Sequence, residues 1–310
     1  MRVITQSAVG DPSVLGVAEA DRPEPDHGQV LIKVRAAGVN PVDGAVRAGL
    51  FPLLGPPPFT LGWDVAGTVE STGPGVSAFA PGDEVLGLLA FPRAGNAYAD
   101  YVLASPNEIV HRPAVLPVEQ AGGLPLAGLT AWQALVGIAR VTEGQRVLVH
   151  AAAGGVGHLA VQIAASFGAH VIGTARTAKH DLLRELGADV LIDHTTADFV
   201  AKTAPVDVVF DLVGGEYGER SAVALKPGGL LVGALGSNLG ITRERAADLG
   251  VRLAVVSVRP SAADLSRLTA LVESGRLRVH LDQVLPLAEV AKAHELLSTR
   301  RTTGKIVLIP

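Results

Sequence analysis

The feature that most constrains the fold is a run of small residues between an apolar, strand-like segment and a helical one. Residues 146–163 read RVLVHAAAGGVGHLAVQI, with Gly154, Gly155 and Gly157 in the turn. A strand, a glycine-rich turn and a helix in this order begin a β-α-β unit. Against the pattern G-x-G-x-x-G, Gly154 and Gly157 fill the second and third glycine positions, whereas Ala152 stands in the first.

Strand and helix patterns alternate around this turn. Six apolar strand segments are separated by helical patterns between residues 116 and 265: RVLVHA, AHVIGTA, DVLID, VDVVFDLV, GGLLVGAL and VRLAVVSV. They are apolar on both faces, as strands buried in a parallel sheet are. We therefore predict a Rossmann fold here, a doubly wound, six-stranded parallel sheet.

The flanking segments have a different character, so the predicted fold class is α/β plus β. Residues 1–115 carry short alternating strands separated by Pro and Gly turns, which predicts a small β-barrel domain. In residues 266–310 we expect a helix over VLPLAEVAKAHELL and a last strand, GKIVLIP, that returns to the first domain. We also expect a helix over TAWQALVGIARV with Thr130 as its N-cap.

Composition excludes several classes of function. The chain has 310 residues, 48% of them hydrophobic, and a net charge of −4, so it can bury a large core and shows no excess of basic residues for nucleic acid. It has no cysteine, which excludes disulfides and thiolate zinc sites. No segment has the pattern of a signal peptide or a membrane span, so we expect a cytoplasmic protein without a membrane partner.

The turn has the chemistry of a phosphate site. Gly154 would let the backbone approach a pyrophosphate, and Gly157 would let the helix pack close to the strand. The N–H groups of Gly155 and Val156, at the start of the helix, would then face the anion. The alternative is a compact turn that binds no ligand.

The residues after the second strand favour NADPH (NADP) over NAD. An NAD site normally has Asp or Glu there to bind the ribose hydroxyls. This chain has no carboxylate from Thr174 to Thr177, and it offers Arg176 and Lys179 where a 2′-phosphate would lie. Alternatively, the two cations are ordinary surface residues.

Several ordered motifs now allow a family comparison. They are AAGVNPVDGAVRAG, PFTLGWDVAGTVESTGPGV, PGDEV, YADYV, GLTAWQAL, VLVHAAAGGVGHLAVQIAASFGA, LGAD and GKIVL. With these motifs the chain resembles the zinc-independent branch of the medium-chain dehydrogenase/reductase superfamily, in particular its NADPH quinone oxidoreductase-like group. The resemblance implies a GroES-like catalytic domain at 1–115, a Rossmann NADP-binding domain at 116–265 and a C-terminal return at 266–310. It also explains the missing first glycine, because the family form of the turn is A-x-x-G-x-x-G, beginning here at Ala151.

The resemblance implies further cofactor contacts. The expected residues on the nicotinamide side are Thr130, Leu235, Gly236, Ser237, Val256 and Val258. His194 stands where relatives have a Tyr that holds the 2′-phosphate, and we expect Arg300 to reach the same phosphate.

The same comparison predicts no zinc. Asn40 replaces a Cys ligand of the metal-dependent members, and Trp63–Asp64 replaces their His–Glu pair. Without a metal, hydride transfer to a conjugated acceptor is the favoured chemistry, because the charge delocalises onto oxygen. The candidate catalytic residues are Asn40 and Tyr98. Asn40 could instead be only the N-cap of a helix that starts at Pro41, and Tyr98 only a structural residue.

We therefore hypothesise an NADPH-dependent reductase of a quinone or an α,β-unsaturated carbonyl (enone). The alternatives are an enoyl-thioester reductase and a non-catalytic NADPH-binding protein. The strand VRLAVVSV is expected at the sheet edge, where pairing with a second copy would form the homodimer that is usual in the family.

Overall fold

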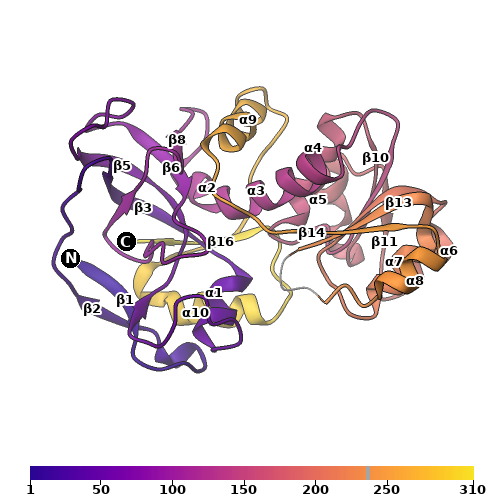
Figure 1. Ribbon diagram of the computed structural model, residues 1–310, viewed down its shortest axis with the longest axis horizontal. Coiled ribbons are helices and arrows are strands. Elements are labelled where there is room, and N and C mark those ends of the chain that lie inside the picture. Colours follow the sequence, from indigo (N-terminus) through magenta and orange to yellow (C-terminus); the bar gives the residue numbers. More distant parts are fainter. Residues whose placement is uncertain (235–237) are drawn as a thin grey trace. The chain divides into compact units, whose positions relative to one another are not determined.

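The computed structural model describes residues 1–234 and 238–310, and its contacts divide the chain into two compact units. Unit 1 comprises Met1–Leu129, Arg259–Gly275 and Val279–Pro310, whereas unit 2 comprises Thr130–Val258 and Arg276–Arg278. Unit 2 is therefore almost a continuous insertion into the chain of unit 1 (Figure 1). The domain boundaries expected from the sequence separate a catalytic domain from a cofactor-binding domain. They stay a prediction.

Unit 2 contains the predicted six-stranded sheet. Its strands are β9 (Arg146–Val149), β10 (His170–Thr174), β11 (Val190–Ile192), β12 (Val206–Asp211), β13 (Leu225–Ala234) and β14 (Arg252–Val256). Their order is β11-β10-β9-β12-β13-β14, and every pairing is parallel. This is the doubly wound arrangement, so the Rossmann prediction is confirmed.

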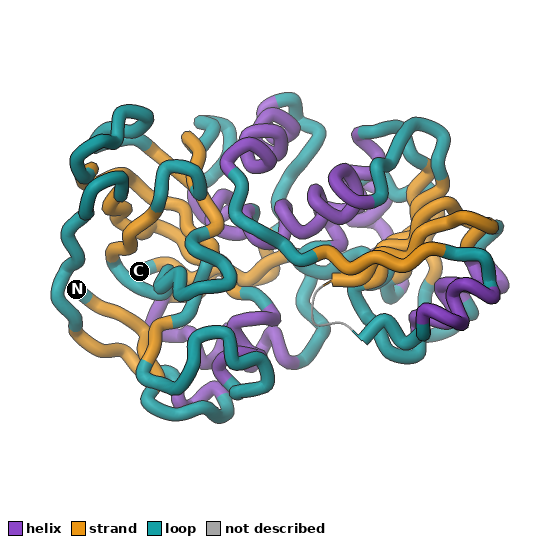
Figure 2. Tube along the Cα trace, in the orientation of Figure 1, coloured by secondary structure: helices purple, strands orange, loops and turns teal. Residues whose placement is uncertain are grey.

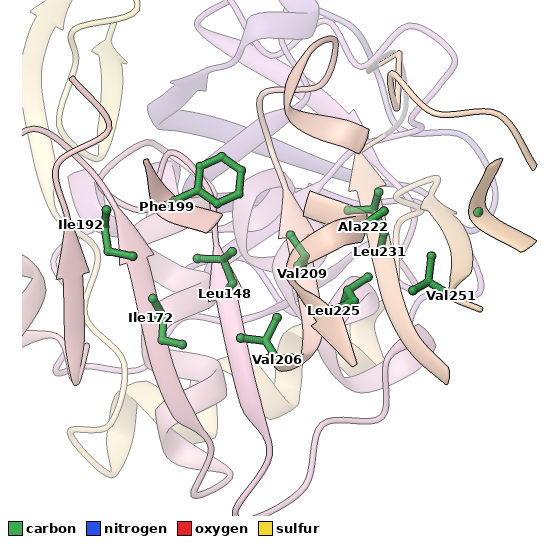
Figure 3. Packing of buried hydrophobic residues seen from close by; sticks show 11 residues of the cluster. Leu148, Ile172, Ile192, Phe199, Val206, Val209, Ala222, Leu225, Leu231 and Val251 are labelled. Carbon is green, nitrogen blue, oxygen red and sulfur yellow. The ribbon is translucent and has the colours of Figure 1, made fainter. Parts of the chain in front are cut away.

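Short helices connect the strands of this sheet (Figure 2). They are α4 (Gly157–Ser166), α5 (His180–Glu185), α6 (Phe199–Lys202), α7 (Tyr217–Ala224) and α8 (Arg243–Asp248), with a 3-10 turn, η3, at Thr177–Lys179. A buried apolar cluster packs α6 and α7 on the sheet, with Leu148 of β9, Val209 of β12 and Phe199 of α6 among its members (Figure 3). The burial of such apolar side chains between the helices and the sheet stabilises a doubly wound fold.

Unit 1 is built on a seven-stranded sheet. The strands are β3 (Val30–Val39), β5 (Asp64–Thr72), β6 (Glu84–Leu88), β7 (Tyr101–Ala104), β8 (Ile109–His111), β15 (Leu281–Pro286) and β16 (Lys305–Ile309). Six of them lie in the order β15-β16-β3-β5-β6-β8, and β7 pairs with β3 beside this path. The last strand, β16, pairs antiparallel with β3, so the end of the chain joins the sheet that begins with β3.

The predicted barrel is wrong in one respect, because the sheet does not close. Its outer strands are β8 and β15, and among the described pairings none joins these two edges. The strand β3 pairs with β7 over Val30–Lys33, with β5 over Val30–Ala36 and with β16 over Ala37–Val39. Strand β3 thus connects the C-terminal strands β15 and β16 to the other strands of this sheet, and no described pairing closes the sheet into a barrel.

The other elements of unit 1 surround this sheet. A second sheet has the order β2-β1-β4, formed by β1 (Arg2–Gln6), β2 (Gly16–Glu19) and β4 (Phe59–Thr60). The helices are α1 (Pro41–Arg47), α2 (Val118–Gly123), α9 (Ala262–Glu273) and α10 (Val290–Ser298), with 3-10 turns η1 (Pro12–Val14) and η4 (Leu287–Glu289). Among the described residues no helix is long and apolar enough to cross a membrane.

Two helix boundaries differ from the predictions. Helix α3 spans Pro125–Trp132 and continues as a π-helical segment, η2, at Gln133–Ile138, so Thr130 lies inside a helix and is not its N-cap. The helix begins at a proline, whose fixed φ suits the first turn. In VLPLAEVAKAHELL the α-helix begins only at Val290, because Val284 to Pro286 form the end of β15 and Leu287 to Glu289 form the 3-10 turn η4.

Candidate functional site

The glycine-rich turn lies at the point where the order of the parallel sheet reverses. From β9 the chain runs outward through β10 to β11, and it then returns to β12 on the other side of β9. The turn at 150–156 follows the carboxyl end of β9 and leads into α4. In open α/β sheets, ligands bind outside the carboxyl ends of the strands at this reversal point.

The carbonyl group of Ala151 explains why glycine stands at positions 154 and 157 of the turn. A Cβ at position 157 would lie 2.4 Å from the oxygen of Ala151, and a Cβ at position 154 would lie 3.2 Å from the same atom. That oxygen accepts a hydrogen bond from the N–H of Gly154 at 2.9 Å. Ala151 itself has a φ of +48°, so this chain has alanine in a left-handed conformation that usually favours glycine. The crowded cradle fits a phosphate held by backbone N–H groups.

Side chains from neighbouring strands hold the start of the turn. Thr174, at the end of β10, accepts a hydrogen bond from the N–H of Ala151 on its hydroxyl and from that of Ala152 on its carbonyl. His150 lies between Thr174 and Ser221, with ring nitrogens 3.1 and 3.0 Å from their hydroxyl oxygens. Burial lowers the pKa of His150 to about 3, so the imidazole is neutral at neutral pH. Because Thr174 is buried, its contribution is to hold the backbone of the turn in place through these hydrogen bonds.

The predicted cations lie on the loop after β10. Arg176 is exposed and precedes the 3-10 turn Thr177–Lys179, in which Lys179 is half-buried. His194 is exposed on the loop after β11. Asp193, the residue before it, accepts hydrogen bonds from the backbone and side chain of Thr177, at 2.7 and 2.6 Å. The structure thus brings the loop of Arg176 and the loop of His194 together through one carboxylate.

The remaining predicted cofactor residues are spread over both units. Thr130 is buried in α3, Val256 is buried at the end of β14, and Val258 is half-buried just after it. Arg300 is exposed in unit 1, where its N–H donates to the carbonyl of Leu297 at the end of α10. Leu235, Gly236 and Ser237 lie outside the described residues. The nicotinamide contacts therefore stay predictions.

In unit 1, Asn40 belongs to a buried polar cluster with Asp64 and Lys305. The Lys305 ammonium donates to the side-chain oxygen of Asn40, to the carbonyl of Val39 at 3.2 Å and to Asp64 at 3.4 Å. The Asn40 amide nitrogen donates to Asp64 at 2.9 Å, and the N–H of Leu126 donates to the other Asp64 oxygen at 2.6 Å. Asn40 is 1% exposed, and these bonds fix the orientation of its amide.

A second buried carboxylate, Asp43, lies between Asn40 and Tyr98. One Asp43 oxygen accepts the backbone N–H of Asn40 at 2.6 Å, which caps α1, while the Asn40 side chain turns away to Asp64. The other oxygen interacts electrostatically with the Tyr98 hydroxyl, and neither atom makes a hydrogen bond of good geometry. Burial raises the pKa of Asp43 to about 7 and that of Tyr98 well above its usual value.

Sequence reasoning missed four residues that organise these sites: His150, Asp193, Lys305 and, as a structural carboxylate, Asp64. His150 and Asp193 each stand within a residue of the end of an apolar strand, a position that could have indicated them. Lys305 is far from Asn40 in the sequence, and only the fold shows that they meet. Among the described residues no group of three or more His, Cys, Asp or Glu side chains could hold a metal ion.

Comparisons with known proteins agree with both units. The family model for the alcohol dehydrogenase GroES-like domain matches residues 26–117, and the model for zinc-binding dehydrogenase matches residues 186–308. The chain is 34% identical to a quinone oxidoreductase of Pseudomonas aeruginosa, over 98% of each protein. The chain is also 38% identical to polyketide synthase GfsB of Streptomyces halstedii. That alignment covers 91% of this chain but 5% of the polyketide synthase.

Solved structures show the same likeness. The quinone oxidoreductase of Coxiella burnetii superposes with a TM-score of 0.95 at 38% identity, over 100% of this chain and 99% of that one. The Escherichia coli quinone oxidoreductase complexed with NADPH gives a TM-score of 0.91 at 30% identity, over the full length of both chains. A Rossmann unit joined to a GroES-like unit defines a medium-chain dehydrogenase/reductase, which is an oxidoreductase. Within that superfamily, the chain belongs to the quinone oxidoreductase-like group.

Proposed function

We propose that this protein is an NADPH-dependent reductase that transfers hydride to a quinone or an α,β-unsaturated carbonyl compound. The observation that carries the proposal is the turn at the reversal point of the sheet, followed after β10 by Arg176 and Lys179 in place of a carboxylate. A Cβ at position 157 would lie 2.4 Å from the carbonyl oxygen of Ala151, so glycine lets α4 start close to the end of β9, as in a turn that binds a pyrophosphate. The E. coli relative complexed with NADPH supports the choice of cofactor.

The chain's own residues would hold the cofactor in three places. The backbone of Gly154, Gly155, Val156 and Gly157, shaped by Thr174, would bind the pyrophosphate. Arg176, Lys179, His194 and Arg300 are proposed for the 2′-phosphate, and Thr130, Val256 and Val258, with Leu235 to Ser237, for the nicotinamide side. When bound, NADPH supplies the hydride.

Asn40 and Tyr98 stay the proposed polar residues of the catalytic unit. Their burial favours an indirect contribution, in which the fixed amide of Asn40 and the Asp43–Tyr98 contact set the shape and charge of the first turn of α1. A quinone or enone accepts hydride into a conjugated system, so the protein needs to orient the acceptor and stabilise the developing oxyanion.

A second candidate is an enoyl-thioester reductase, which the likeness to a segment of a polyketide synthase favours. Its acceptor is also conjugated, so the hydride chemistry would be the same. The higher structural similarity to quinone oxidoreductases over the full chain favours the first candidate. A third candidate, an NADPH-binding protein without turnover, has no specific observation in its favour.

One assay distinguishes these candidates. We would follow NADPH absorbance with a panel of quinones, small enones and enoyl-CoA esters, and repeat it with NADH. Faster turnover of quinones or enones with NADPH supports the proposal. Preference for enoyl-CoA supports the second candidate, and tight NADPH binding without turnover supports the third.

We further propose a cytoplasmic homodimer. The strand β14 is at the edge of the six-stranded sheet, and its Val255 is 44% exposed. An exposed apolar edge strand is suited to pairing with the same strand of a second copy. The absence of cysteine fits a reducing compartment.

A further inference from the structure

The carboxylate of Asp193 accepts four hydrogen bonds from two loops of unit 2. One oxygen accepts the backbone N–H of Thr177 at 2.7 Å and its hydroxyl at 2.6 Å. The other accepts the backbone N–H of Thr195 at 2.9 Å and its hydroxyl at 2.6 Å. These bonds hold the pKa of Asp193 far below its usual range, so the carboxylate is ionised at any working pH.

The two loops that Asp193 joins carry the candidate phosphate ligands. Thr177 stands between Arg176 and Lys179, in the 3-10 turn after β10. Thr195 directly follows His194, in the loop after β11. Backbone bonds stiffen both loops, from the N–H of Lys179 to the carbonyl of Arg176 and from the N–H of Ala197 to the carbonyl of Asp193.

We propose that Asp193 is a positioning residue that sets NADPH specificity by fixing the Arg176–Lys179 loop and the His194 loop in the geometry that binds a 2′-phosphate. The proposal rests on the proposed function, because it deepens the choice of NADPH. The proposal is the opposite of what charge alone predicts for a carboxylate near a phosphate. A carboxylate beside a phosphate site would repel the ligand, and its removal would then tighten binding.

The hydrogen bonds decide between these two effects. Each oxygen of Asp193 already faces two donors, which offset much of its negative charge locally. The carboxylate is also near the surface, where water and salt screen its repulsion. The loss of the four charge-assisted bonds, by contrast, would release both loops directly.

The test is calorimetric titration of the full chain and of the Asp193→Asn variant with adenosine 2′,5′-bisphosphate and with adenosine 5′-monophosphate. An amide oxygen can replace one acceptor, but the amide nitrogen cannot accept from the other threonine. We expect the variant to bind the bisphosphate about tenfold more weakly and the monophosphate within about threefold of the unmodified chain. Bisphosphate binding that is equal or tighter in the variant overturns the proposal.

Two threonine variants keep the test informative if Asp193→Asn unfolds. Thr177→Val removes one bond from the loop of the two cations, and Thr195→Val removes the equivalent bond on the other side. Both leave the charge of Asp193 in place. The proposal expects Thr177→Val to weaken bisphosphate binding selectively, and an unchanged preference for the bisphosphate in both variants overturns it.

The failure of the proposed function would look different. If the unmodified chain binds the bisphosphate no better than the monophosphate, the assignment of NADPH fails and this inference fails with it. If the chain prefers the bisphosphate and loses that preference in Arg176→Gln, but not in Asp193→Asn or Thr177→Val, only the role of Asp193 is wrong.

Discussion

Asp64 shows how this chain keeps a charged residue in a dry interior. Its carboxylate is fully buried and has three donors: the Lys305 ammonium, the Asn40 amide and the N–H of Leu126. Burial raises the pKa of Asp64 above its usual value, and Lys305 is the largest of the influences that oppose this rise. The ammonium is therefore the group on which the ionised cluster depends.

Removing the ammonium is expected to leave a buried charge without its counterion. Lys305→Met should lower the free energy of unfolding by about 3–5 kcal/mol, measured from urea denaturation. The double variant Lys305→Met/Asp64→Asn, which removes both charges, should recover part of that loss. Equal losses in the single and double variants would contradict an electrostatic role for the pair.

Asp43 predicts a pH dependence of stability with a defined sign. Its pKa is about 7 in the folded chain, above the value of about 3.9 expected when unfolded. The folded state therefore holds an extra proton between about pH 4 and 7, so this stabilising contribution is complete at low pH and is lost as the pH rises. Urea denaturation of the unmodified chain and of Asp43→Asn should show it.

The difference between those two proteins isolates Asp43 from the other titrating groups. His150 and His294 have pKa values lowered to about 3 by burial, and they oppose the trend by destabilising the fold as the pH falls below about 6.5. We expect the stability of Asp43→Asn relative to the unmodified chain to rise by on the order of 4 kcal/mol from pH 4 to pH 7. A relative stability that does not change with pH would refute the raised pKa.

At the scale of elements, the junction of β9, the turn and α4 depends on close backbone contact. The carbonyl of Ala151 lies where side chains at positions 154 and 157 would point. A glycine at position 157 therefore lets the helix start directly beneath the strand end. In the proposed function, the same turn would present its N–H groups to the pyrophosphate of the cofactor.

Gly157→Ala should weaken NADPH binding by more than about tenfold and destabilise the fold by about 1–3 kcal/mol, because the new Cβ meets backbone that cannot move aside. The measurements are fluorescence titration with NADPH and urea denaturation. Gly44→Ala is the matched control, since nothing lies within 4 Å of its Cβ position in α1. The control should bind NADPH normally and gain up to about 1 kcal/mol.

The extent of sequence prediction also becomes clear at this scale. All six strands of the parallel sheet could be predicted, because buried parallel strands are apolar on both faces and turns separate them. Thr130 was misplaced because an apolar helix that begins at Pro125 has no polar stripe to mark its start. The contacts of Asn40 with Asp64 and Lys305, and of Asp193 with Thr177, could not be predicted. They depend on how distant segments pair, which periodicity does not encode.

At the scale of the whole molecule, the homodimer that we propose would form through the edge strand β14. Val255→Lys would place a charge on that edge and should oppose strand pairing between copies. Sedimentation equilibrium should report a dimer for the unmodified chain and a monomer for this variant. Val223→Lys, at a valine on α7 that is 53% exposed, is the control and should stay dimeric. A monomeric unmodified chain would contradict the proposed dimer.

The pairing of β16 with β3 has a consequence for the order in which the protein can mature on the ribosome. Asp64 leaves the ribosome early, yet its ammonium partner lies 241 positions further along the chain. Unit 2, almost all of it one continuous segment, has its whole sheet available before β15, α10 and β16 are synthesised. Unit 1 is thus the first unit whose synthesis begins and the last whose fold can be completed. Its buried carboxylate, Asp64, acquires the Lys305 counterion only as translation ends.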